Sequence, residues 1–265
     1  MTVPSDRRPP APAARRRLVL RVSTRHDVEA GLQTTIALAS ALRGELSALF
    51  VEEEASLHAV ALPFQTLMDF TGGLVTLAPG RIETAMRGEA RACRRLLAAA
   101  AEQARLQWSF RSLRGDALHL LHQEGIAGDI LVLNLDRFGL SGGEALARAG
   151  QLAPPGGGVL LLPPKVSRKA QPPAAQPVLT LGQDATPAAP LRGLAEHLAQ
   201  ALGSPLGHCT IAGPASVPAL AGELARARLL LMRLESPLFD APDSLRQIGF
   251  ALRAPLLAIR TDQAG

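Results

Sequence analysis

Apolar runs and helical periodicity alternate along the first 164 residues of the chain. Residues 17–23 and 45–51 are short apolar runs typical of buried strands, and apolar residues recur every three to four positions from Leu32 to Leu42 between them. Asp27 is a candidate N-cap of this helix, and Gly44 a candidate residue just beyond its end. A strand–helix–strand unit predicts a right-handed crossover and therefore a parallel sheet.

The alternation continues after an irregular, partly apolar segment at 55–82. That segment is too long for a simple connection, and we expect it to cover the carboxyl edge of the sheet or to contact a partner. The following pattern predicts helices at 83–106, 117–125 and 144–149, and strands at 107–114, 129–135 and 158–162. The first part of the chain therefore predicts five strands.

The pattern starts again after a basic, proline-rich stretch at 165–176. Strands are predicted at 177–184, 208–212, 228–234 and 254–260, and helices at 191–202, 218–227 and 244–252. We predict an α/β fold of two tandem, open, parallel-sheet domains, at 17–164 and 177–265. The second is abbreviated and lacks the insertion and one strand. The two halves pair as a pseudo-dimer, with a homodimer as the alternative.

Composition changes this picture little. The hydrophobic content of 47% over 265 residues is typical of a globular protein, and the arginines of a proline-rich tail at 1–16, predicted to be disordered, supply most of the net charge of +5. With one Trp and no Tyr, the chain predicts no DNA-binding face. The tail lacks a signal peptide's apolar core, and no membrane span is visible. Cys93 and Cys209 are predicted to be buried, unpaired residues, so we expect a cytoplasmic protein.

Few residues suggest catalysis or metal binding. Glu52, Glu53 and Glu54 are adjacent, which favours a solvated strand end over a cation site. His119 and His122 lie i, i+3 on one helix without a further ligand, which favours surface histidines over a metal site. An enzyme would depend on His26, Asp27 and Asp136 beside the first and fourth strands. We therefore predict no enzymatic activity and no metal.

The most informative stretch is 129–164, where an apolar run, a Gly-rich turn, a short helical pattern and a second apolar run follow one another. In an open α/β sheet this is where phosphates meet backbone N–H groups and a helix N-terminus. Together with the opening LVLRVS and the passage RGDALHLLHQEGIAGDILVLN, this stretch resembles the universal stress protein family. The resemblance implies a five-stranded parallel α/β sheet, often dimeric.

The resemblance also points to a nucleotide site. ATP-binding members carry an Asp at the end of the first strand, where this chain has Ser23, and a signature G-x2-G-x9-G-[ST] after the fourth strand, whose first glycine corresponds to Asn134. The Gly-rich loop 134–150 remains, in another register. The candidate nucleotide-binding residues are Val22, Ser23, Asn134, Gly139, Ser141, Gly142 and Gly143.

Two functions follow from these observations. The first is a universal stress protein-like regulatory or adaptor protein that binds an unknown protein partner, has an eroded nucleotide site and needs no cofactor. The alternative is a stress sensor that binds ATP or AMP through the loop 134–150. The first is favoured because the glycine signature is incomplete and segment 55–82 offers an apolar surface to a partner.

Overall fold

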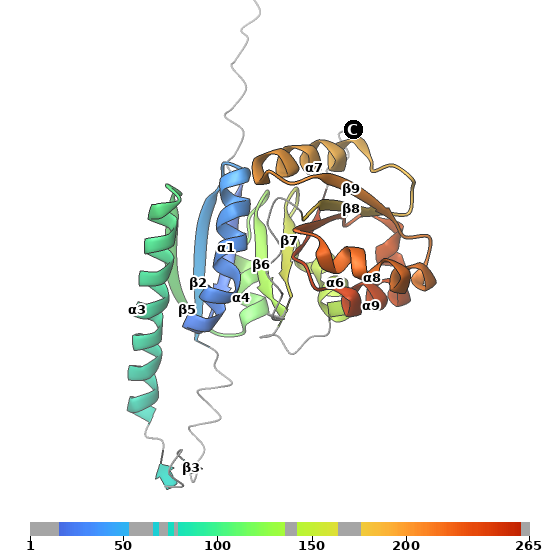
Figure 1. Ribbon diagram of the computed structural model, residues 1–265. Coiled ribbons are helices and arrows are strands. Elements are labelled where there is room, and N and C mark those ends of the chain that lie inside the picture. Colours follow the sequence, from blue (N-terminus) through green and yellow to red (C-terminus); the bar gives the residue numbers. More distant parts are fainter. Residues whose placement is uncertain are drawn as a thin grey trace, which may run out of the picture.

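A computed structural model describes residues 16–52, 66–68, 74–76, 79–135, 142–163 and 176–260 (Figure 1). Within these residues one nine-stranded sheet has the order β5-β2-β1-β6-β7-β11-β10-β8-β9. Its strands are β1 (Arg17–Val22), β2 (Glu45–Glu52), β5 (Trp108–Arg114), β6 (Ile130–Asn134), β7 (Gly158–Leu162), β8 (Val178–Gly182), β9 (Leu206–Thr210), β10 (Leu229–Arg233) and β11 (Leu256–Ile259).

Neighbouring strands are parallel within each half of the sheet, and the halves meet where β7 and β11 pair antiparallel. The second half follows β11-β10-β8-β9, the order of the first half without a counterpart of β5 among the described residues. The predicted fold class, a mostly parallel α/β sheet with an abbreviated second half, is confirmed. The intramolecular pairing of the two halves is also observed.

Helices cover both faces of the sheet, and each face has its own core that crosses the boundary between the halves. This two-sided burial explains why the central strands are apolar at nearly every position. One face carries α1 (Arg25–Ala41), α3 (Pro79–Gln103) and α7 (Ala189–Leu202). The other carries α4 (Ala117–Glu124), α6 (Gly142–Leu152), α8 (Val217–Arg226) and α9 (Pro242–Ala251).

The ends of α1 differ from the sequence prediction. Thr24 is the N-cap, and Asp27, the third residue of the helix, completes a capping box with it. After the helix, the left-handed residue is Arg43, with φ of 50°, rather than Gly44. Gly44 is needed for a different reason, because a Cβ there would lie 2.2 Å from the carbonyl oxygen of Arg16. Arg16, which we placed in the tail, accepts a hydrogen bond from the Glu45 N–H at 3.1 Å.

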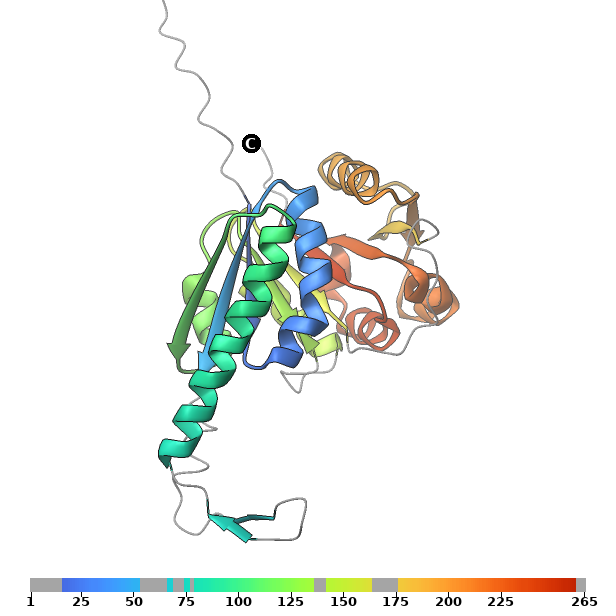
Figure 2. The same ribbon diagram turned by 60° about the vertical axis from the view of Figure 1, so that its left-hand side comes forward.

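Helix α3 begins at Pro79 rather than at Glu83 and extends beyond the sheet (Figures 1 and 2). An antiparallel hairpin, β3 (Thr66–Met68) and β4 (Leu74–Thr76), lies at its far end. This described part of segment 55–82 does not cover the sheet. The other residues of that segment up to 78, the tail to residue 15 and most of the linker lie outside the described residues.

Candidate functional site

The predicted site lies at the carboxyl ends of β1 and β6, which are neighbouring parallel strands. Helix α1 leaves β1 on one face of the sheet and α6 follows β6 on the other. A crevice between strands whose helices diverge in this way is the general position for ligands in open α/β sheets. Val22, Ser23 and Asn134 lie at these strand ends.

The polar groups at the end of β1 are already engaged by the chain itself. One carboxylate oxygen of Asp27, Oδ2, accepts hydrogen bonds from the Ser23 N–H at 2.9 Å, the Ser23 hydroxyl at 2.8 Å and the Thr24 N–H at 2.9 Å. Asp27 is 2% exposed. Because this buried carboxylate oxygen already accepts from all three donors, they are not available to an incoming anion.

A second carboxylate reaches the N-terminus of α1 from α3. Glu89 Oε1 accepts a hydrogen bond from the Arg25 N–H at 2.6 Å, and Glu89 Oε2 lies 3.3 Å from Arg25 Nε. Two acidic side chains thus face the positive end of the α1 dipole. The electrostatic attraction that this helix end would offer to a phosphate is taken up by Asp27 and Glu89.

The glycine predicted to approach a phosphate packs against a helix instead. A Cβ on Gly143 would lie 2.8 Å from Arg246 Cα, so its lack of a side chain allows α6 and α9 to approach closely. Gly142 begins α6, Val22 is fully buried, and Asn134 is 5% exposed. Gly139 and Ser141 lie outside the described residues, so the loop part of the predicted site stays a prediction.

The second half has a crevice of its own, which the sequence analysis did not identify as a cavity. The strand registers place Gln183 at the position of Ser23 and Arg233 at that of Asn134. A cavity of about 110 Å³ lies there, lined by Gln183, Asp184, Arg233 and Glu235 among others. Two of these are carboxylates, and Arg233 Nε lies 3.6 Å from Glu235 Oε2. The lining thus has two carboxylates against one guanidinium, which makes it poorly suited to a phosphate.

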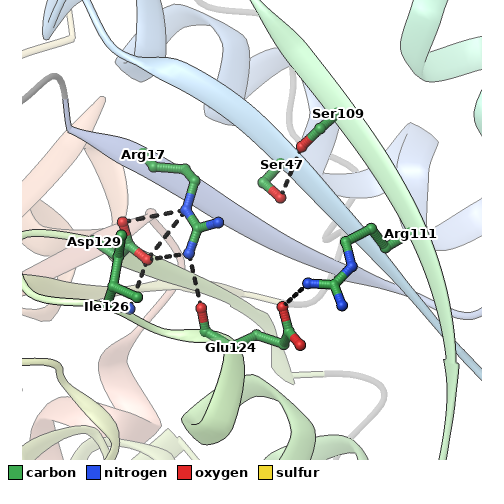
Figure 3. Close-up of polar contacts among 7 residues, drawn as sticks. All are labelled: Arg17, Ser47, Ser109, Arg111, Glu124, Ile126 and Asp129. Atoms are coloured by element: carbon green, nitrogen blue, oxygen red, sulfur yellow. Dashed lines mark hydrogen bonds and ion pairs between the residues drawn. The ribbon is translucent and has the colours of Figure 1, made fainter.

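A partly buried ion pair at the opposite edge of the sheet, with the Arg17 side chain 23% and that of Asp129 3% exposed, is structural (Figure 3). Arg17 Nη2 lies 2.6 Å from Asp129 Oδ2 and also donates to the Glu124 carbonyl at 2.7 Å. Asp129 Oδ2 accepts from the Ile126 N–H at 2.9 Å. The hydrogen bond to Asp129 raises the pKa of Arg17. These contacts join the start of β1 to the turn before β6, and they engage both charges, so we assign the pair a role in stability.

The remaining candidate residues form no further site among the described residues. His119 and His122 are exposed on α4, and no group of three metal-ligating side chains is found in the described part of the chain. Cys93 and Cys209 are buried and free, as predicted. Burial raises the pKa of each thiol to about 12, with Glu89 contributing at Cys93 and Glu223 at Cys209. Asp136 lies outside the described residues.

Comparisons with known proteins show similarity in structure but not in sequence. The sequence matches no protein-family model and no curated protein. A protein of unknown function from Pseudomonas aeruginosa aligns with a TM-score of 0.52 at 10% identity, over 94% of both chains. A Pseudomonas aeruginosa protein assigned as a universal stress protein aligns with a TM-score of 0.51 at 12% identity, again over 94% of both chains. The chain has the universal stress protein fold.

A universal stress protein from Archaeoglobus fulgidus aligns with a TM-score of 0.49 at 12% identity, over 94% of this chain and 97% of that chain. The fold rests on the two Pseudomonas aeruginosa structures with TM-scores of 0.52 and 0.51, and at identities of 10% and 12% they leave the site to its own geometry. No described helix is both long and apolar enough to cross a membrane.

Proposed function

We propose that this protein is a universal stress protein-like regulatory or adaptor protein that acts by protein contact, without a resident nucleotide and without enzymatic activity. The observation that carries the proposal is the Asp27 carboxylate, which takes up the Ser23 and Thr24 donors at the end of β1. The packing of Gly143 against α9 supports it, because a glycine in a helix contact is not available to a phosphate.

The arm formed by α3 and the β3–β4 hairpin supports the adaptor role. From Glu83 to Ala92 no described side chain of α3 is fully buried, whereas Cys93, Leu97 and Ala101 are. The N-terminal part of the helix, before Glu89 contacts α1 and Ala90 packs against the core, thus projects from the molecule (Figures 1 and 2). The helix also exposes four arginines spaced to lie on one side, which favours an acidic partner surface. They are Arg87, Arg91, Arg94 and Arg95.

Calorimetric titration with ATP and with AMP tests the nucleotide part of the proposal, after any co-purified nucleotide has been removed. We expect no saturable heat at millimolar ligand. Saturable binding by the wild-type protein would instead favour the adenine-nucleotide sensor, with the loop 134–150 as its site.

Site-specific photocrosslinking in cells tests the adaptor part. A photoreactive residue replaces Arg91 on the arm, and the matched control replaces Arg226, an exposed arginine on α8. We expect a discrete adduct with another protein from position 91 only. The same adducts from both positions, or none from position 91, would contradict a role of the arm in partner binding.

A further inference from the structure

The two halves of the molecule meet asymmetrically where α1 packs beside α7. In the sheet, Leu18 pairs with Ile130 and Val178 pairs with Leu229, which makes β1 and β8 equivalent. The two helices also end alike, because the Gly44 N–H donates to Ala39 and the Ser204 N–H donates to Ala199.

Ala37 and His197 each lie two residues before these accepting carbonyls, so they occupy equivalent positions on α1 and α7. On the His197 side the exposed ring bridges the two helices, because its Nε2–H donates to the Ala41 carbonyl of α1 at 2.7 Å. On the Ala37 side only a methyl group is present, and Thr34 stands at the position of Leu194. Smaller side chains on α1 than on α7 at these positions thus leave room beside α1.

A cavity of about 380 Å³ occupies this space. Ala37 and Thr34 of α1 and Leu202 of α7 line its sides, and Leu229 and Pro255 line it at the start of β10 and β11. Its volume falls within the range of about 300–1,000 Å³ that is common for small-molecule sites, which favour boundaries between domains. It is separate from the predicted nucleotide site at the ends of β1 and β6.

Arg228 gives this cavity its chemical character. It is the one charged residue among the lining residues, all of which are described, and none of them is acidic. Its Nη1 is held by the Ser204 hydroxyl at 3.2 Å and by the carbonyl at the end of α7, from Leu202. The guanidinium is therefore fixed in position, and its other N–H groups remain to bind an anionic group.

We propose that this α1–α7 cavity binds a small amphiphile with a single negative charge. Its apolar body packs against Ala37, Leu202 and Leu229, and its carboxylate or sulfonate pairs with Arg228. Bound in this position, the ligand contacts both halves and stabilises their pairing. The proposal does not depend on the nucleotide crevice or on the arm.

Titration with the fluorescent probe 8-anilinonaphthalene-1-sulfonate, which has an apolar body and one sulfonate, tests the proposal. We expect fluorescence enhancement that saturates at one site per chain. Octanoate should displace the probe, and octan-1-ol should displace it at least about tenfold more weakly. Absence of saturable binding, or equal displacement by the acid and the alcohol, would overturn the proposal.

Two variants locate the binding site. Ala37→His places in the cavity wall the residue that stands at the equivalent position of α7, and we expect it to weaken probe binding about tenfold or more. Ser40→His adds the same side chain to an exposed position of α1 and is expected to bind like the wild type. Wild-type affinity in a folded Ala37→His variant would overturn the proposal. If that variant fails to fold, Thr34→Leu takes its place. Wild-type affinity for the probe in Thr34→Leu would also overturn the proposal.

Discussion

At the scale of single residues, charged side chains decide what the carboxyl edge of the first half can do. Asp27 looked like a helix cap in the sequence, and it also satisfies the end of β1, with Ser23 and Thr24 as donors. Two other charged residues stood inside apolar strand patterns, Arg21 in the first strand and Arg233 in β10, and both become largely buried. Arg233, a charge within an apolar strand pattern, was therefore the sequence signal for the cavity of the second half.

Replacing Asp27 should show how much its carboxylate contributes. We expect Asp27→Ala to lower the free energy of unfolding by about 1–2 kcal/mol, because three donors lose their acceptor and the capping box is lost. Glu29→Gln, at an exposed position of the same turn, is the control and should change stability little. Urea unfolding measures both variants. An unchanged midpoint in Asp27→Ala would mean that other groups satisfy the end of β1.

The two cysteines give a pH prediction. Burial raises the pKa of Cys93 and of Cys209 to about 12 from the usual value of 9.0, so both remain thiols at neutral pH. We expect slow labelling by iodoacetamide at pH 8 in the native protein and rapid labelling in urea. The raised thiol pKa values stabilise the fold fully below pH 9, and this contribution is lost as the pH rises from about 9 to 12. Fast native labelling of either cysteine at pH 8 would contradict its burial.

At the scale of elements, periodicity predicted the order of strands and helices, because each strand is buried on both faces and each helix on one. It predicted element ends less well: α3 begins four residues early, at Pro79, and Thr24 rather than Asp27 caps α1. The pattern of hydrophobic positions could not show what Gly143 contacts. Gly143 lies in a Gly-rich turn that suggests a phosphate loop, yet its neighbour is the backbone of α9, which is about a hundred positions away in the sequence.

Two glycines of α6 provide a matched test of this packing. In Gly143→Ala the new Cβ would lie 2.8 Å from Arg246 Cα, so α6 and α9 must separate, and we expect a loss of about 1–3 kcal/mol in unfolding free energy. In Gly150→Ala no heavy atom lies within 4 Å of the new Cβ, and the better helix propensity should add up to about 1 kcal/mol. Thermal unfolding compares the two. Equal effects would mean that α6 and α9 are not in close contact.

At the scale of the whole molecule, the pairing of β7 with β11 makes one structure of two similar halves. Both hydrophobic cores contain residues from each half: Leu131 and Leu256 belong to one core, and Leu20 and Leu257 to the other. The sequence predicted that the halves would pair, with a homodimer as the alternative, because the second half has no glycine at 235–244, directly after the strand 228–234, and so lacks a phosphate loop of its own. It did not predict that they would share both cores, because burial across the seam depends on the register of Leu161 with Leu256.

Shared cores imply that the halves unfold together. The one tryptophan, Trp108, lies on β5 at the far edge of the first half and reports on that half alone, whereas far-ultraviolet circular dichroism reports on the whole chain. We expect the two signals to give coincident transitions in urea. Leu131→Asp places a charge in the first half and Leu257→Asp in the second, both at fully buried positions, so either variant should abolish the native Trp108 signal. A native Trp108 signal in Leu257→Asp would show that the first half folds without the second, and the seam between β7 and β11 would then be a contact between two independent domains.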